Sequence, residues 1–436
     1  MFHRYFPAIG LVWVLAFGSA SQSQAAPVAT VNFAHPQVVG NAVGFMHGGE
    51  PLLSDPVAAA FRVRSAGLSP GIWRGVPREW SLHLADVQLL GARPVFVLSD
   101  LWGLPGHWPA VWPFDNLPAY SAWVRRRAAE FGRMIPSGPI WVDIWNEPDT
   151  ARYWPLARDP HLDRYKVTFL AAEQALRAEL GSRVRVLGPS TAGKSSMWTS
   201  RLIAFCAAHH CHLDGVAWHI AGGGSRAMSG LARSLHRAHE LAAHNGSWRA
   251  VLSGKRQFFV TEYTPVAQRF LPGALLSYWA QLERGGAEQA AFAVWGHGRP
   301  EDGLLDALLD IWGQPRSTWW ASRIYAVGRP ARVASATSSP LWPVLGTRHG
   351  SYDKREVLLG SWGLRAGRVL LRMRGLPPRR RLRLRLAVLR PVRGLWEAGL
   401  TWPRRRTASL LKVDKHGSAS RYIFVPGGSV VDILVG

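Results

Sequence analysis

The feature that most constrains the fold is a regular alternation between short apolar runs and helix-like segments from residue 43 to residue 327. Near-continuous apolar strands separated by helices are typical of parallel strands that are covered on both faces. Eight such strands predict a closed (β/α)8 TIM barrel, an α/β fold. The eight runs are residues 43–46, 71–75, 93–100, 139–147, 184–190, 215–220, 257–263 and 290–297.

The main alternative is an open, doubly wound sheet. Such a sheet binds nucleotides through a glycine-rich loop of the type G-x-G-x-x-G directly after a strand. The one glycine-rich stretch that follows a strand, "AGGGS" at 221–225, has the wrong spacing and is typical of a turn. The closed barrel is therefore the favoured fold.

The pattern changes after about Gly328. From Arg381 to Leu386, arginine and leucine alternate strictly, which places the leucines on one face of a strand and the arginines on the other. We predict a catalytic barrel over 43–330 and an antiparallel β-sandwich domain over 331–436, with the segment 27–42 pairing with that domain.

Residues 1–26 have the pattern of a signal peptide. Arg4 gives a positive start, "IGLVWVLAFGSA" is a short apolar core, and small residues near Ala25 and Ala26 offer a cleavage site. The sequence thus predicts a periplasmic or secreted protein with no transmembrane segment after signal removal. An uncleaved anchor is the alternative.

The two cysteines, Cys206 and Cys211, lie in "FCAAHHCHLD" beside three histidines. A disulfide suits an oxidising compartment, a metal site suits Cys and His ligands, and two small buried side chains suit a helix end. Residues i and i+5 lie about 140° apart around a helix. Either a disulfide or a shared metal therefore requires the helix to break between the cysteines.

The chain has a formal net charge of +24, and most of its basic residues are arginine. This charge allows an anionic partner such as an acidic polysaccharide. It is also consistent with a bias toward arginine across the whole chain, in which case the arginine face of the C-terminal sheet is simply solvated. The stretch 379–390 has no interleaved aromatic residues, which argues against nucleic acid as the partner.

Two glutamates end two of the predicted barrel strands. Glu147 ends the fourth run in "IWNEP", and Glu262 ends the seventh in "VTEY". The carboxyl ends of barrel strands form the active face, so these side chains are expected on opposite sides of one pocket. A pair of carboxylic residues is what the hydrolysis of a glycosidic bond requires.

Other polar and aromatic residues are predicted around the same pocket, where aromatic rings can stack on sugars. They lie at strand ends or in the loops that follow, and they are Arg74, Trp102, Asn146, Trp154, His219, Tyr263 and Trp295.

These motifs carry a resemblance. "WNEP" at the fourth strand and "TEY" at the seventh, with "GPS", "WH" and a tryptophan at the fifth, sixth and eighth, resemble the retaining glycoside hydrolases of clan A. With the trailing β-domain the chain looks most like glycoside hydrolase family 39, which includes β-xylosidases, α-L-iduronidases and bacterial exopolysaccharide endoglycosidases. The resemblance covers the chain from about Val28 to the C-terminus.

The resemblance implies a role for each matching residue. Glu147 matches the general acid/base, Glu262 the nucleophile and Asn146 the amide that binds the sugar 2-hydroxyl. Arg74 matches an arginine that keeps the nucleophile ionised, while burial against Trp145 is expected to raise the pKa of Glu147. His219 and Trp295 match pocket-lining positions, and no metal or cofactor is implied.

The chain departs from the family's pattern at one place. Many relatives carry an aromatic residue soon after the histidine of the sixth strand, often a tyrosine that touches the nucleophile, and "HIAGGG" has none. Tyr263 is the candidate to replace it, and a wider pocket is the alternative.

The sequence therefore predicts a retaining glycosidase that acts on an extracellular or periplasmic polysaccharide, with endo action favoured by the aromatic loops. An exo-acting β-xylosidase or uronidase is the nearest alternative. A barrel that binds carbohydrate without cleaving it is the alternative from another class. Sugar identity, linkage and oligomeric state are not predicted.

Overall fold

The structure is a computed structural model of the chain. It describes residues 25–46, 62–75, 84, 87–102, 111–193, 196–221, 224–264, 266–293, 303–305, 307–350, 354–391 and 406–436. Residues 1–24 of the predicted signal peptide lie outside the described part of the chain. Trp295, a predicted site residue, also lies outside it. Within the described part of the chain, no helix combines the length and the apolar character that crossing a membrane requires.

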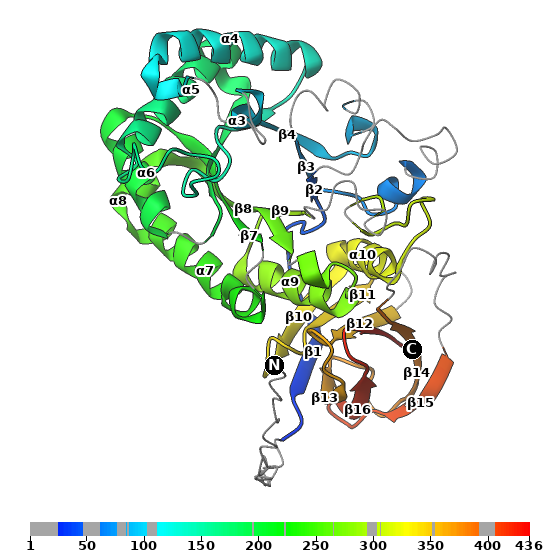
Figure 1. Cartoon of the computed structure of the whole chain (residues 1–436). Coiled ribbons are helices and arrows are strands. Elements are labelled where there is room, and N and C mark those ends of the chain that lie inside the picture. Colours follow the sequence, from blue (N-terminus) through cyan, green and yellow to red (C-terminus); the bar gives the residue numbers. More distant parts are fainter. Residues whose placement is uncertain are drawn as a thin grey trace, which may run out of the picture.

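Eight parallel strands close into a barrel in the order in which they follow one another along the chain, which confirms the predicted (β/α)8 fold (Figure 1). The strands are β2 (Phe45–Met46), β3 (Ile72–Gly75), β4 (Arg93–Val97), β5 (Ile140–Asp143), β6 (Val184–Thr191), β7 (Leu213–Ala221), β8 (Leu252–Thr264) and β9 (Gln289–Phe292). The helices named here are α3 (Leu98–Leu101), α4 (Leu117–Met134), α5 (Asp163–Leu180), α6 (Ser196–His209), α7 (Gly224–His244), α8 (Gly246–Val251), α9 (Pro272–Gly285) and α10 (Ser317–Gly328).

The inside of the barrel is plugged by one apolar layer. Each strand from β3 to β9 contributes one buried residue to it, so the barrel is a packed core at this level and not a channel. The layer consists of Ile72, Val95, Trp141, Leu187, Ala217, Phe259 and Ala291.

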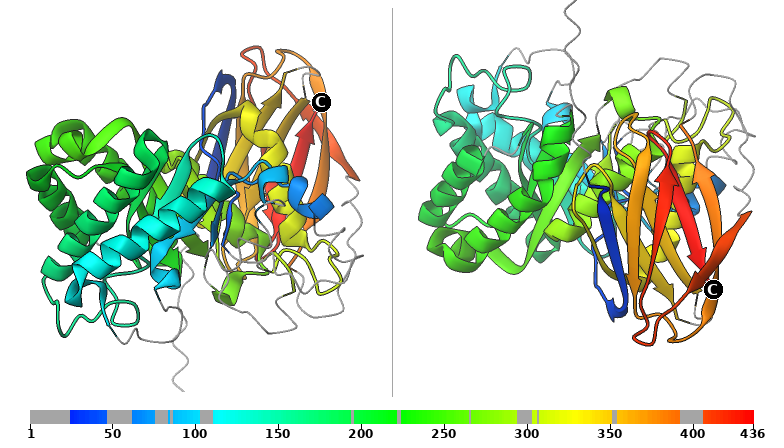
Figure 2. Two further views of the ribbon diagram at one scale, coloured as in Figure 1. Left: turned by 90° about the horizontal axis from the view of Figure 1, so that it is seen from above. Right: turned by 90° about the horizontal axis from the view of Figure 1, so that it is seen from below.

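The second region, which we call the β-domain, is one nine-stranded sheet that curls around its own apolar core (Figure 2). Its strands are β1 (Val28–Pro36), β10 (Arg332–Thr337), β11 (Val344–His349), β12 (Lys354–Gly360), β13 (Gly367–Arg374), β14 (Arg381–Leu389), β15 (Arg406–Lys412), β16 (Ala419–Val425) and β17 (Val430–Val435). The sheet is mostly antiparallel, as predicted, but β1 lies parallel to β13 while pairing antiparallel with β10. The N-terminal strand is thus built into the C-terminal domain.

Helices α9 and α10 join the two regions by packing against strands of the β-domain. Arg332 is buried at this junction, where its Nε donates to Glu283 Oε1 of α9 (3.0 Å) and its Nη1 to Thr347 Oγ1 of β11 (2.8 Å). Close by, the Gly273 N–H donates to the Gly428 carbonyl oxygen (3.0 Å). The apolar core of the barrel also continues into the β-domain through Leu358 and other residues.

Cys206 and Cys211 form a disulfide. Their Cα atoms are 4.6 Å apart because α6 ends at His209 and His210 adopts a positive φ of 55°. The helix therefore breaks between the cysteines, as a bridge requires, and of the three alternatives the structure has the disulfide.

Candidate active site

The candidate site is the layer of side chains directly above the apolar plug. Because side chains alternate along a strand, the residue two positions after each plug residue also faces inward. On three strands this next residue is buried and ionisable: Arg74 on β3, Asp143 on β5 and His219 on β7. On these strands the inward-facing residue above the apolar layer is therefore ionisable, and together these residues form a charged cluster.

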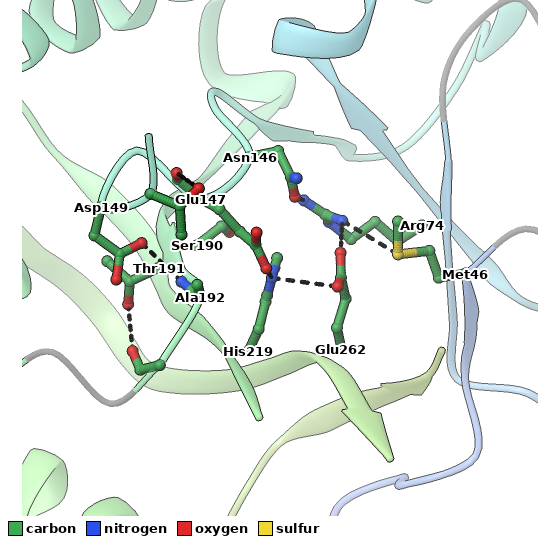
Figure 3. Close-up of polar contacts among 12 residues, drawn as sticks. Met46, Arg74, Asn146, Glu147, Asp149, Ser190, Thr191, Ala192, His219 and Glu262 are labelled. Atoms are coloured by element: carbon green, nitrogen blue, oxygen red, sulfur yellow. Dashed lines mark hydrogen bonds and ion pairs between the residues drawn. The ribbon is translucent and has the colours of Figure 1, made fainter. Parts of the chain in front are cut away.

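Arg74 is the centre of this cluster and is fully buried. Its Nε donates to Asp143 Oδ2 (2.9 Å), its Nη1 to Glu262 Oε1 (2.7 Å) and its Nη2 to Asn146 Oδ1 (2.7 Å), and Nη1 also lies 3.4 Å from the Met46 sulfur (Figure 3). One guanidinium thus holds two carboxylates and an amide in fixed positions. Its positive charge favours the ionised form of Glu262.

Glu147 is held by an unusual backbone conformation. Its φ is 44° and that of Ser190, at the end of β6, is 49°, a region that residues other than glycine rarely adopt. The Glu147 N–H donates to the Ser190 carbonyl oxygen (2.9 Å), and Ser190 Oγ donates to Asp143 Oδ2 (2.7 Å). The two strained residues therefore support each other, and both are tied to the carboxylate that anchors Arg74.

His219 lies between the two candidate catalytic carboxylates (Figure 3). Its Nδ1 is 2.9 Å from Glu147 Oε1 and 3.3 Å from Glu262 Oε2. Burial and the nearby Arg74 lower the pKa of His219, although the hydrogen bond to Glu147 opposes them. The imidazole is therefore neutral near pH 7, and because Nδ1 faces two carboxylates, Nδ1 carries the proton and donates it.

The pKa of Glu147 is lowered from its ordinary value. Burial acts to raise it, but the hydrogen bond from His219 and the positive charges of Arg74 and Arg152 together outweigh burial. The expectation that burial would raise this pKa is therefore wrong in its net direction. Glu147 is ionised near pH 7 in the free protein.

The two carboxylates are close together and differ in exposure. One oxygen of Glu147 and one of Glu262 lie within 4.8 Å of each other, and both lie within that distance of a ring nitrogen of His219. The Glu147 side chain keeps 14% of its surface exposed, whereas Glu262 is fully buried. Of the pair, Glu147 is the residue that reaches solvent.

Asn146 directly precedes Glu147, and hydrogen bonds hold both its backbone and its side chain. Its backbone N–H donates to Ser99 Oγ (3.0 Å) from α3, and its Oδ1 accepts from Arg74. Because Oδ1 is occupied by a guanidinium that can only donate, the side-chain NH2 group remains the donor that this amide can offer to a ligand.

Two of the predicted sugar-stacking residues are core residues. Trp154 is fully buried, packs edge-on against Trp145, and donates its Nε1–H to Asp159 Oδ2 (2.9 Å). Tyr263 is 1% exposed, and its hydroxyl donates to the Ala42 carbonyl oxygen (2.7 Å). Neither residue has the exposed surface that stacking requires, so the prediction that they contact substrate was wrong.

The same holds for the suggestion that Tyr263 replaces a tyrosine beside the nucleophile, because its hydroxyl is committed to Ala42. His219 occupies the position next to Glu262 instead. Trp102 is half-buried; its Nε1–H donates to the Val111 carbonyl oxygen (3.0 Å), and its ring packs edge-on against Tyr120.

Sequence reasoning overlooked Asp143 and Ser190. Asp143 lies inside the apolar run "IWVDIW", where a carboxylate two residues after an inward-facing tryptophan is itself inward-facing. That signal was available in the sequence. Ser190 belongs to the "GPS" motif, but its bond to Asp143 depends on the contact between two strands and had no local signal.

A cavity of about 300 Å³ lies outside the barrel wall. It is bounded by Trp218 of β7 and by residues of α7 that include Arg233 and Arg237. Trp218 and His219 are consecutive on β7, so they face opposite sides of the strand. The cavity is therefore behind the candidate site and does not belong to it.

Several solved structures share this architecture. N2152 from Neocallimastix frontalis has a TM-score of 0.77 at 18% identity and covers 94% of this chain and 99% of its own. The GH39 enzyme from Xanthomonas axonopodis pv. citri has a TM-score of 0.64 at 16% identity, with 96% and 99% covered. A GH30 endoxylanase from Clostridium papyrosolvens C71 has a TM-score of 0.57 at 15% identity, with 93% and 99% covered.

No protein-family model and no curated protein sequence matches the chain. At these identities the likeness shows the fold alone, which in this chain is a closed barrel joined to a β-domain.

Proposed function

We propose that the protein is a retaining glycoside hydrolase that acts on a polysaccharide. The observation that carries this proposal is the pair Glu147, four residues after β5, and Glu262, near the end of β8, with carboxylate oxygens within 4.8 Å of each other. Retaining enzymes have carboxyl groups about 5–5.5 Å apart, whereas inverting enzymes need about 6.5–9.5 Å to admit a water molecule. The nearest oxygens of Glu147 and Glu262, within 4.8 Å, fit the closer arrangement and support retention.

In the proposed mechanism, Glu262 attacks the anomeric carbon while Glu147 donates a proton to the leaving oxygen. This step forms a bond between Glu262 and the sugar and breaks the glycosidic bond. Glu147 then removes a proton from water, which attacks the same carbon and releases both the sugar and the Glu262 carboxylate. Arg74 keeps Glu262 ionised, and the Asn146 NH2 group donates to the sugar 2-hydroxyl.

The experiment compares the wild-type protein with Glu262→Gln on a panel of polysaccharides. We expect turnover to fall by at least the roughly 10²–10⁴-fold that a positioned catalytic group contributes, while glycan binding is retained. Glu179→Gln, which changes an exposed residue of α5, is the matched control and should keep full turnover. A barrel that only binds carbohydrate would show binding but no turnover in any of the three proteins.

Product analysis tests the finer parts of the proposal. The anomeric configuration of the first product, read by NMR, should match that of the substrate, and inversion would contradict the assignment of Glu262.

Endo action remains a prediction, because two of the tryptophans that suggested a long cleft, Trp112 and Trp154, are buried. Release of mixed oligosaccharides would support endo action, and release of single sugars would support an exo-acting enzyme. Export to the periplasm or medium remains part of the proposal.

A further inference from the structure

The positive charge is not spread evenly along the chain. Residues 332–436 contain 21 of the 52 lysines and arginines but five of the 28 aspartates and glutamates, which places +16 of the net charge of +24 in about a quarter of the sequence. A general bias toward arginine would distribute the charge in proportion to length. The β-domain therefore carries most of the electrostatic field of the protein.

Within the part of the β-domain that the structure describes, few acidic side chains neutralise this charge at the surface. Among the described residues of the β-domain, Glu356 and Asp432 are buried, at 7% and 1% exposure. Asp414 is exposed, but one of its carboxylate oxygens accepts the backbone N–H groups of His416 and Ser418 within a turn.

Part of the positive surface is also aromatic. Tyr422 and Phe424 point outward from β16 with 55% and 59% of their surface exposed. In the register of the antiparallel pair, Arg368 of β13 lies directly opposite Phe424, and Arg372 is four residues further along β13, opposite Ser420. Both arginines are exposed. We call Arg368, Arg372, Tyr422 and Phe424 the arginine–aromatic face.

A second row of arginines continues this surface around the domain. Strands β15 and β16 stand at the two ends of the strand order but approach each other as the sheet curls. On β15, Leu410 is 57% exposed and pairs with Arg383 of β14. Phe424 and Leu410 thus each have an arginine as a cross-strand neighbour. Figure 1 shows β13 and β16 on the side of the β-domain away from the barrel.

We propose that the arginine–aromatic face binds an acidic polysaccharide, that is, a glycan with carboxylate groups along its chain. Residues two apart on one strand are separated by about 7 Å, which lets the two rings contact neighbouring sugars of one chain. Arginine binds carboxylates through paired hydrogen bonds. A glycan is favoured over other polyanions because the barrel fixed to this face is proposed to cleave glycans, so the inference rests on the proposed function and extends it to an anionic substrate.

The test uses the full chain with Glu262→Gln, so that binding is measured without cleavage. Affinity for polygalacturonate, a polyuronate, is compared with affinity for neutral dextran over a range of salt concentrations. We expect polygalacturonate to bind more tightly and its affinity to fall as salt rises. Arg368→Gln combined with Arg372→Gln should weaken polygalacturonate binding about 10-fold or more and reduce the salt dependence, because two charge contacts are lost.

The aromatic part of the face is tested separately. Tyr422→Ala combined with Phe424→Ala should weaken binding about 10-fold with the salt dependence unchanged, by analogy with the loss of ring stacking on other polymers. Tyr422→Phe, which keeps the ring, should bind like the parent protein.

The matched control is Arg125→Gln combined with Arg126→Gln, which removes the same charge from an exposed part of α4 on the barrel. It should leave polygalacturonate binding unchanged. An equal loss in this control would overturn the proposal, since it would show attraction to net charge alone. Tighter binding to single-stranded DNA or to phosphatidylglycerol vesicles than to polygalacturonate would also overturn it.

Turnover separates this inference from the proposed function. In the chain with Glu262 intact, the face variants should keep full turnover of short oligosaccharides and raise KM for the acidic polymer only. If no glycan is cleaved but the face variants still lose polygalacturonate binding, the inferred binding face is supported and the proposed function fails. If glycans are cleaved and the face variants bind normally, the face is wrong and the proposed function stands.

Discussion

Arginine serves two different purposes in the two regions of this protein. In the barrel, Arg74 is fully buried and each of its nitrogens contacts a partner on another segment of the chain. In the β-domain, Arg368 and Arg372 are exposed on one strand and carry charge without organising a core. Arg74 is therefore a structural and electrostatic centre, whereas Arg368 and Arg372 are surface features, and the difference between them lies in burial.

The largest effect on stability and turnover is expected from replacing Arg74, the centre of the buried charged cluster. Arg74→Met leaves Asp143 and Glu262 buried without their common cation, so the free energy of unfolding should fall by about 3–5 kcal/mol and turnover should be lost. Chemical denaturation measures the first quantity. Arg74→Lys keeps the charge but cannot reproduce the planar set of donors, so it should recover only part of the stability.

Arg125→Met, on the exposed face of α4, is the control for the loss of an arginine side chain. It should change the free energy of unfolding by no more than about 0.5 kcal/mol. An Arg74→Met protein that is as stable as this control would show that the buried cluster does not contribute to stability.

The second prediction concerns the pH dependence of the proposed reaction. Glu147 must be protonated to act as an acid, so kcat/KM should fall as pH rises through its pKa. Because His219, Arg74 and Arg152 hold this pKa below its ordinary value, the fall should begin under acidic conditions. His219→Phe removes the hydrogen bond and leaves burial to act more strongly, so the falling limb should move to higher pH.

His219→Asn keeps a donor near Glu147 and is the matched variant, for which a smaller displacement of the limb is expected. A pH–rate profile of each protein measures the effect. Movement of the limb to lower pH in His219→Phe would show that His219 does not lower the pKa of Glu147.

The smallest effect is expected in the β-domain. Arg368→Gln and Arg372→Gln change exposed side chains, so each should alter the free energy of unfolding by about 0.5 kcal/mol or less. Thermal and chemical denaturation of the double variant check this. A loss as large as that of Arg74→Met would mean that these arginines stabilise the sheet, and the contrast between the two regions would not hold.

Much of the architecture was predictable because it depends on short-range periodicity. The eight apolar runs gave the barrel, and the alternation from Arg381 to Leu386 gave a strand of the β-domain. Strand ends also indicated where Glu147 and Glu262 would meet. Contacts between distant segments could not be predicted. Arg74 and Glu262 are 188 residues apart in sequence, and no local sequence pattern predicts that Arg74 Nη1 lies 2.7 Å from Glu262 Oε1.

The aromatic residues also show a limit of prediction from sequence, because their burial could not be predicted. Trp154 follows a strand at the active end of the barrel, and by position alone it was a candidate for sugar binding. In the structure it packs against Trp145 and Tyr165, and its indole N–H bonds to Asp159. Sequence position gives the end of the barrel on which a side chain lies, but burial depends on which neighbours fold over it.

The sequence by itself determined the two periodicities, the barrel and sheet that follow from them, and the presence of two carboxylates at strand ends. Only the tertiary structure decided that His219 lies between those carboxylates, that the net pKa shift of Glu147 is downward, and that the cysteines are bonded. The physical reason is range: side-chain alternation is set by the backbone of adjacent residues, whereas charge pairing and burial are set by segments that meet only in the folded chain.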